Sequence, residues 1–152
     1  MPLKLCELLG LLLSALVTGM FFGPWAALSR SFHTFPPDVF LPVVHRMGRN
    51  VGAVMTMLMP AALLSLLPVL ALSYGAHPLT FFLTLAGLAL FAAALAVTMA
   101  VEVPIVHRME SWTPATLPDG WQASRDRWGS FHVVRVSASI LGLLLLLAGA
   151  IF

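Results

Sequence analysis

Residues 79–101 read LTFFLTLAGLALFAAALAVTMAV and contain no charged side chain. The run is continuously apolar rather than alternating, and a helix of roughly 20 residues, at about 1.5 Å of rise per residue, crosses a bilayer core. Three similar blocks occur at residues 5–28, 51–73 and 131–152. A lipid-exposed backbone must satisfy its own hydrogen bonds, which favours helices over the alternating strands of a barrel. We therefore predict an all-α, polytopic membrane protein whose single domain, residues 1–152, is a four-helix bundle.

The overall composition agrees with a protein that has lipid as its solvent. Hydrophobic residues make up 60% of the 152 residues and charged residues only 9%, whereas roughly a quarter of the residues of a soluble domain are charged. The formal charge is +2, and the few basic residues lie beside the apolar blocks. We expect the lipid bilayer as a partner and no nucleic acid.

The first apolar block resembles a signal peptide because Lys4 precedes a leucine-rich run. It is too long for one, and Phe21, Phe22 and Pro24 make its end a poor cleavage region. We expect a retained helix. The single cysteine, Cys6, cannot form an internal disulfide.

The basic residues predict the orientation of the bundle. Loop one (residues 29–50) and loop three (residues 102–130) hold most of them, while Lys4 stands alone at the opposite side. We expect the protein in the cell membrane. The positive-inside rule then places both loops in the cytoplasm and both termini on the outer side. These loops exceed the roughly 2 to 8 residues usual between bundle helices, and we expect them to form a cap of short interfacial pieces.

Glycines spaced four apart are candidates for helix packing. Gly19 and Gly23 lie in the first block, and Gly48 and Gly52 lie at the start of the second. Small residues let membrane helices approach closely. The same small-residue faces could also pack against a second copy of the chain, so a homo-oligomer is a possible partner state.

Polar side chains line up before and inside the fourth block. Arg125, Trp128, His132 and Arg135 are separated by three, four and three residues, which places them on one face of a helix. A cation inside an apolar block is costly without a partner. Glu102, near the end of the third block, is the expected partner of Arg135.

Further polar groups gather at the same end. Pro104 should kink or end the third helix and direct Glu102 and His107 toward a common cavity. His45 and Arg49 lie one turn apart, with Asn50 beside them. The tryptophans fit two interpretations equally, an interfacial belt or the walls of a slot for a flat aromatic ligand; they are Trp112, Trp121 and Trp128.

The histidines raise the question of a metal. His45, His107 and His132, with Glu102, have the ligand chemistry of zinc, iron or copper. No HxxxH or ExxH spacing occurs, and three helices would have to supply the ligands. We assign no metal ligand, although iron or copper is a candidate cofactor.

The order of these motifs resembles the anthrone oxygenase-like family of small four-helix membrane proteins. The resemblance rests on a glycine-bearing first helix, on residues 47–50 (MGRN), on residues 101–105 (VEVPI), and on residues 121–135 leading into the fourth helix. It covers nearly the whole chain. The family often has an asparagine-rich stretch where this chain has Val106, His107 and Arg108.

The resemblance implies an oxidation of anthrones to anthraquinones by molecular oxygen, with no conventional organic cofactor. On that basis His132 is the expected base, Glu102 orients it or pairs with Arg135, and Arg135 or Arg49 stabilises the oxyanion. The tryptophans would stack on the planar substrate. Two other classes of function stay open. A non-catalytic protein could bind a lipid, a quinone or another hydrophobic ligand in the same pocket, and a small transporter would need polar groups running through the membrane.

Overall fold

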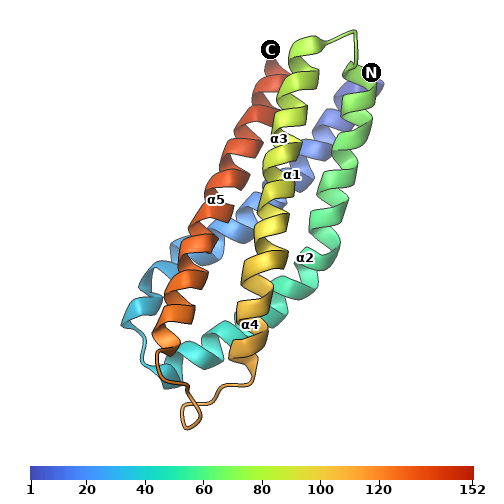
Figure 1. The fold of residues 1–152 in the computed structure, drawn as a ribbon. Helices are drawn as coiled ribbons and strands as arrows, with labels where there is room; N and C mark the ends of the chain where they lie inside the picture. The colour runs from blue at the N-terminus through green and yellow to red at the C-terminus, as the bar shows by residue number, and fades with distance from the viewer.

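The computed structural model describes residues 1–152 and contains helices only. They form four rods (Figure 1). The first is α1 (Pro2–Ala27) with the 3₁₀ helix η1 (Ser29–Thr34), and the second is α2 (Pro37–Ser73). The third runs through α3 (Pro78–Val97), the π-helical turn η2 (Thr98–Glu102) and α4 (Val103–Glu110), and the fourth is α5 (Trp121–Ile151). Each rod is long and apolar enough to cross a membrane, so the predicted all-α, multi-pass fold is confirmed.

The helices extend far beyond the apolar blocks, and the prediction of two long loops is wrong in this respect. Residues 37–50 belong to α2, and most of the predicted loop three belongs to α4 and α5, which leaves residues 111–120 as the only long non-helical connection. Pro37 stands at the first turn of α2 and Asp38 follows it. Proline suits the first helical position and a carboxylate complements the helix dipole there, so α2 begins well before its apolar run.

The connections sort to the two ends of the bundle. Figure 1 shows both termini and the turn between α2 and α3 at one end, with η1 and residues 111–120 at the other. We call the second end the cap end. There a hydrophobic cluster joins η1, α2, α4 and α5, so the predicted cap exists, although it is built largely from helix. The cluster comprises Phe32, Phe40, Leu41, Val44, Ile105, Met109 and Trp128.

Of the four glycines predicted for helix packing, only Gly48 has a close neighbour, because a Cβ atom added there would lie 3.4 Å from a methyl carbon of Val106 on α4. A Cβ atom added at Gly19, Gly23 or Gly52 would meet nothing within 4 Å. In contrast, a Cβ at Gly87 of α3 would lie 2.9 Å from a methyl carbon of Leu146 and 3.1 Å from the carbonyl oxygen of Gly142, both on α5. The absence of side chains at Gly87 and Gly142 therefore brings α3 and α5 into close contact.

The third rod changes its helical form just before Pro104. Proline has no N–H to bond the carbonyl four residues earlier, and the turn Thr98–Glu102 is π-helical, with the Val103 N–H bonded to the Thr98 oxygen. Such widened turns occur often at functional sites. Glu102 is the last residue of this turn and is buried.

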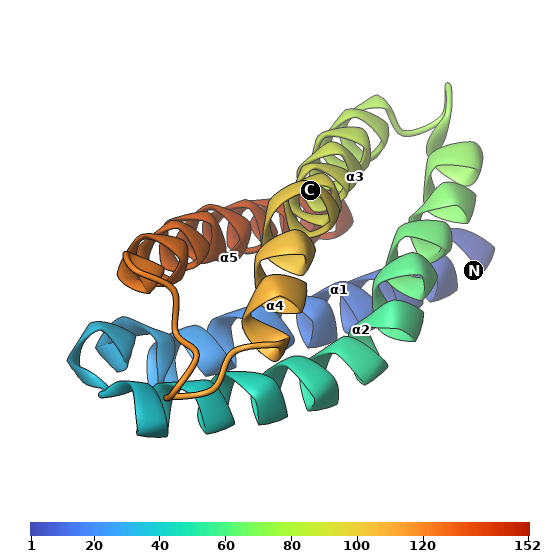
Figure 2. The same ribbon diagram turned by 60° about the horizontal axis from the view of Figure 1, so that its bottom comes forward.

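Three prolines lie inside α2, namely Pro42, Pro60 and Pro68. Each removes one backbone hydrogen bond and bends the helix. Figure 2 shows α2 curving along one side of the bundle, across from the α3–α4 rod.

Candidate functional site

A cavity of about 520 Å³ lies between α2 and the α3–η2–α4 rod, toward the cap end. Its walls come from all four rods. Five methionines supply much of the apolar wall, and they are Met20, Met47, Met55, Met59 and Met99. Unbranched thioether side chains adapt to the shape of a bound molecule, and sulfur packs well against aromatic rings. The volume falls in the range of roughly 300–1,000 Å³ that holds small organic ligands.

The inner wall of the cavity carries a buried ion pair. The Glu102 carboxylate of η2 binds the Arg135 guanidinium of α5 through Oε2 and Nη1, and both residues are buried. Arg135 also donates to the Thr98 hydroxyl at 3.2 Å. Below the guanidinium lies the ring of Phe21, whose centroid is 4.3 Å from Cζ, a cation–π arrangement. The pair predicted from the sequence is therefore present, with α1 supplying an aromatic support.

His132 completes this group, one turn before Arg135 on α5. Its Nδ1 lies 2.7 Å from Nη2 of Arg135 and 3.6 Å from Oε1 of Glu102. A guanidinium only donates hydrogen bonds, so Nδ1 accepts, and a neutral His132 carries its hydrogen on Nε2. The imidazole stacks on Trp128, with ring centroids 5.1 Å apart and planes inclined by 7°. These contacts hold the ring in one orientation.

Three buried polar atoms of this group have no hydrogen-bond partner within the protein. They are Oε1 of Glu102, Nε2 of His132 and Nε of Arg135. Buried polar atoms are nearly always hydrogen-bonded, and all three residues line the cavity. The group thus offers a bound molecule one carboxylate acceptor and at least one N–H donor. An acceptor beside a donor suits proton removal from carbon next to a carbonyl group.

Five of the residues predicted for the site line the cavity. These are Glu102, His107, Trp128, His132 and Arg135. His107 is exposed, at the surface side of the cavity, whereas the other four are buried.

The other six predicted residues lie elsewhere. His45 is half-buried, with Nε2 2.8 Å from the Met109 carbonyl oxygen, and Arg49 and Asn50 are exposed on α2. Trp112 and Trp121 pack against the cap cluster, while Arg125 lies over the Trp121 ring and pairs with Asp126.

No three side chains of His, Cys, Asp or Glu come together as a possible metal site. Within the inner wall, Glu102 already pairs with Arg135, and the same guanidinium occupies Nδ1 of His132. A cation so close also opposes a second positive charge. The residues present therefore do not fit an iron or copper ion.

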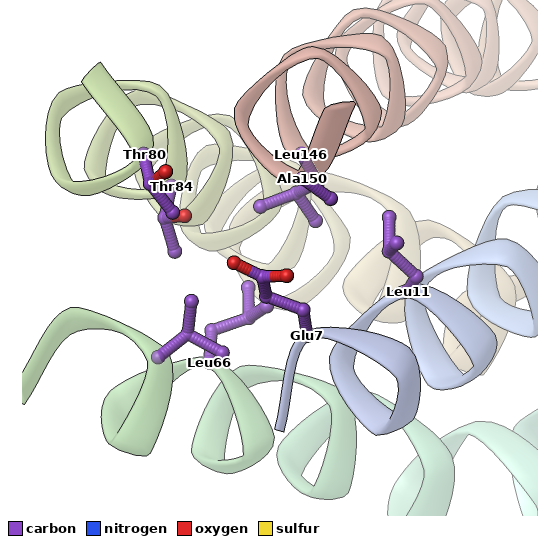
Figure 3. A pocket seen from close by; sticks show the side chains of 8 residues that line it. Glu7, Leu11, Leu66, Thr80, Thr84, Leu146 and Ala150 are labelled. Atoms are coloured by element: carbon purple, nitrogen blue, oxygen red, sulfur yellow. The ribbon is translucent and has the colours of Figure 1, made fainter. Parts of the chain in front are cut away.

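Sequence reasoning missed two features. One is the methionine wall, to which the first block contributes Met20 and the regions in and near the second and third blocks contribute the other four methionines. The other is Glu7 of α1, which is 6% exposed, pairs with Lys4 at 3.0 Å, and has an unpartnered Oε1. Figure 3 shows its carboxylate on the side of Thr84, in a cavity of only about 10 Å³ that α1, α2, α3 and α5 line. A carboxylate alone within an apolar block was the available indication.

Comparisons with known proteins give one match. The sequence model of a family described as anthrone oxygenase matches residues 48–145, from α2 to near the end of α5. The matched range contains Glu102, His132 and Arg135. No curated protein and no solved structure shows significant similarity to the chain.

Proposed function

The chain belongs to the anthrone oxygenase family, and from this premise we propose that it is a membrane oxidoreductase that oxidises a planar, anthrone-like aromatic substrate with molecular oxygen. The observation that carries the proposal is the inner wall of the 520 Å³ cavity. There a buried carboxylate and a buried imidazole each have one polar atom without a protein partner. Burying an ionisable side chain inside a membrane costs free energy, so its presence there favours a functional role.

The net reaction converts a ring methylene and one O₂ into a ketone and one water. A base first removes a proton from the methylene, and the electron pair of the broken C–H bond moves into an enolate. The carbon then forms a bond to oxygen, with oxygen reduced and carbon oxidised. The protonated base returns its proton to the carbon-bound peroxide, and the hydroperoxide then loses water, with cleavage of its O–O bond and of the second C–H bond, to leave the ketone. The protein has to accept a proton and stabilise a negative oxygen.

We assign the proton acceptor to Oε1 of Glu102 and the donor to Nε2–H of His132. The reason is the hydrogen bond from Arg135 to Nδ1 of His132 at 2.7 Å, which leaves the neutral imidazole without a free lone pair. His132 then donates to the substrate oxygen that becomes the enolate. The positive charge of Arg135 compensates the negative charge of the Glu102 carboxylate and of the enolate that forms beside it. The sequence-based assignment of His132 as the base stays a competing prediction, which the variants below separate.

The test uses 1,8-dihydroxyanthrone with purified protein in lipid vesicles, followed by oxygen consumption and by absorbance of the anthraquinone above the protein-free rate. Because a general base contributes about 10²–10⁴-fold, Glu102→Gln should lose at least about 100-fold of the turnover. His132→Gln, which retains an N–H near the Nε2 position, should stay within about tenfold of wild type, whereas His132→Ala should not.

Different outcomes have different meanings. If Glu102→Gln keeps turnover while His132→Gln and His132→Ala both lose it, His132 is the base. Glu7→Gln is the matched control, because it alters a buried carboxylate at the opposite end of the bundle. Wild-type protein without oxygen consumption would contradict the oxidoreductase proposal.

A second candidate function is ligand binding without turnover. The predominance of apolar and methionine side chains in the cavity wall equally suits a quinone or a lipid. Such a protein would bind an anthraquinone and consume no oxygen. The oxygen electrode therefore separates the two candidates directly.

For the orientation we infer that the cap end faces the cytoplasm. Its arginines outnumber the single Lys4 of the other end, as the positive-inside rule requires of a cytoplasmic side. These arginines are Arg30, Arg46, Arg49, Arg108, Arg125 and Arg127. Accessibility of a cysteine introduced at Ser111, an exposed position at the cap end, to an impermeant reagent tests the orientation in intact cells.

A further inference from the structure

The cavity has an opening on one side of the bundle. Several residues that line it are also exposed at the surface, and they stand on only two rods. Gly52, Thr56 and Pro60 belong to α2, while Met99, His107 and Glu110 belong to the α3–η2–α4 rod. We call the space between these two sets the side opening. Figure 2 shows the ribbons of these two rods, α2 and α3–α4, facing each other.

Part of the side opening lies within the apolar segments. Thr56 and Pro60 stand inside the apolar run of α2, and Met99, which is 60% exposed, lies near the end of the third apolar block. Segments of this length and hydropathy lie in hydrocarbon. His107 and Glu110 lie about two to three turns further toward the cap end, where polar side chains reach the interface. The side opening thus extends from the interface into the lipid region.

The cap end gives no comparable route to water. The cap cluster fills it, with Phe32 stacked on Trp128 at 5.7 Å and in edge contact with Phe40 at 5.4 Å. His45 ties α2 to the end of α4 through the Met109 carbonyl. A molecule moving along the bundle axis would have to displace these buried rings, each of which carries a large share of the packing energy.

The opposite wall is closed as well. At the depth of the cavity, the ion pair between Glu102 and Arg135 joins the third rod to α5. Closer to the termini, the two rods stay in direct contact at Gly87 and Gly142. The rod of α1 covers the inner group, since Phe21 lies against Arg135. Only the interface between α2 and the α3–η2–α4 rod remains loosely packed.

We propose that the cavity exchanges its ligand directly with the hydrocarbon core of the bilayer through the side opening. Its ligands are therefore aromatic molecules that partition into lipid, and they carry a carbonyl or hydroxyl group on the end that reaches Glu102 and His132. The apolar end of the ligand lies among the methionines and faces the lipid. This inference rests on the proposed function, and it adds the route and the polarity of the substrate.

The test measures exchange of a ligand that the protein does not convert, in phosphatidylcholine vesicles. The probe is 1,8-dihydroxyanthraquinone, and quenching of tryptophan fluorescence reports its binding because Trp128 lines the cavity. Gly52→Phe places a ring in the side opening, where an added Cβ meets nothing within 4 Å. Gly23→Phe is the matched control, because its Cβ is equally free and it does not line the cavity.

A narrowed route slows association and dissociation together. We expect both rate constants to fall about tenfold or more in Gly52→Phe, with less than about a threefold change in Kd, while Gly23→Phe stays within about twofold of wild type. Thr56→Phe, one turn further along α2, narrows the same opening and should act in the same direction. It serves as the second variant if Gly52→Phe fails to fold.

Unchanged rates in both narrowed variants, with the probe still bound, would overturn the side opening and leave the proposed function standing. Faster exchange in Phe40→Ala, which loosens the cap cluster, together with normal rates in Gly52→Phe would place the route at the cap end and also overturn it. A wild-type protein that binds no probe refutes the aromatic ligand class, and the inference falls with it.

Discussion

Glu102 and Glu7 are both buried carboxylates inside a membrane bundle, yet their surroundings differ in three respects. The partner of Glu102 is the buried Arg135, whereas the partner of Glu7 is Lys4, whose side chain is 69% exposed. Glu102 lines a cavity of about 520 Å³, and Glu7 one of about 10 Å³. Only Glu102 has a histidine beside it.

The comparison shows that burial of a carboxylate does not by itself mark a site. An exposed lysine neutralises Glu7 while keeping contact with water, and it also donates to the Ala150 carbonyl, so it joins α1 to α5. The space beside Glu7 is about the minimum that one water molecule needs. Glu102 has both a locked charge partner and room for an organic molecule, and these two features together distinguish a candidate site from a structural contact.

The largest expected difference between the two ends concerns stability. Arg135→Met leaves Glu102 buried without its cation, which should lower the free energy of unfolding by about 3–5 kcal/mol. Lys4→Met removes an exposed partner and should cost less than about 1 kcal/mol. Denaturant unfolding in detergent micelles measures both. Equal losses in the two variants would mean that the two ion pairs are equivalent.

Removing both charges at the Glu102 end separates stability from chemistry. In the double variant Glu102→Gln, Arg135→Met no unpaired charge is left, so the loss should shrink to about 2 kcal/mol or less. Turnover of 1,8-dihydroxyanthrone should remain at least about 100-fold below that of the wild type, because the proton acceptor is gone. A double variant that is as unstable as Arg135→Met would show that the arginine stabilises the bundle through contacts other than its charge.

Packing should differ between the closed and the open sides of the bundle. Gly87→Ala introduces a methyl group 2.9 Å from Leu146, and overpacking of this kind costs roughly 1–3 kcal/mol. Gly52→Ala meets nothing within 4 Å and should gain up to about 1 kcal/mol from helix propensity. Thermal unfolding of the two variants side by side checks the sign of each effect. A destabilising Gly52→Ala would indicate that the side opening is more tightly packed than described.

The smallest effect is expected at Glu7. Glu7→Gln keeps the shape of the side chain and removes a charge whose partner is exposed, so stability should change by no more than about 1 kcal/mol. Turnover should match the wild type within error. A loss of turnover in this variant would connect the two ends of the bundle and contradict the separation drawn here.

The fold was predictable because one effect dominates it, namely the burial of long apolar segments in the bilayer. Four apolar blocks that match the thickness of a bilayer allow little except four helices. The helix boundaries were harder to predict from the sequence, because the early start of α2 depends on Pro37 and on packing in the cap cluster rather than on the apolar pattern. Which glycines pack was also beyond the sequence, since the contact of Gly87 with Gly142 depends on how α3 and α5 face each other.

The inner part of the site was predictable for a related reason. Arg135 lies in an apolar run and requires a carboxylate, and Glu102 was the one carboxylate near the end of the neighbouring block. The outer part was not predictable from residue type. His45, Arg49 and Asn50 had suitable chemistry, but which face of α2 turns toward the cavity depends on how this helix packs against α4 in the cap cluster. The hydrogen-bonding state of His132 required an actual distance, namely the one from Arg135 to Nδ1.

The prolines within α2 also bear on the motion of the bundle. Each of them removes an amide that would otherwise close the helical ladder, while α3 and α5 are joined by glycine contacts with no slack. Slow opening of backbone hydrogen bonds is therefore expected mainly in the middle of α2, where amide hydrogens should exchange with solvent deuterium earlier than those of α5 at equal depth. We then expect α3 and α5 to keep their relative position, and the width of the cavity to change mainly with the local opening and bending of α2.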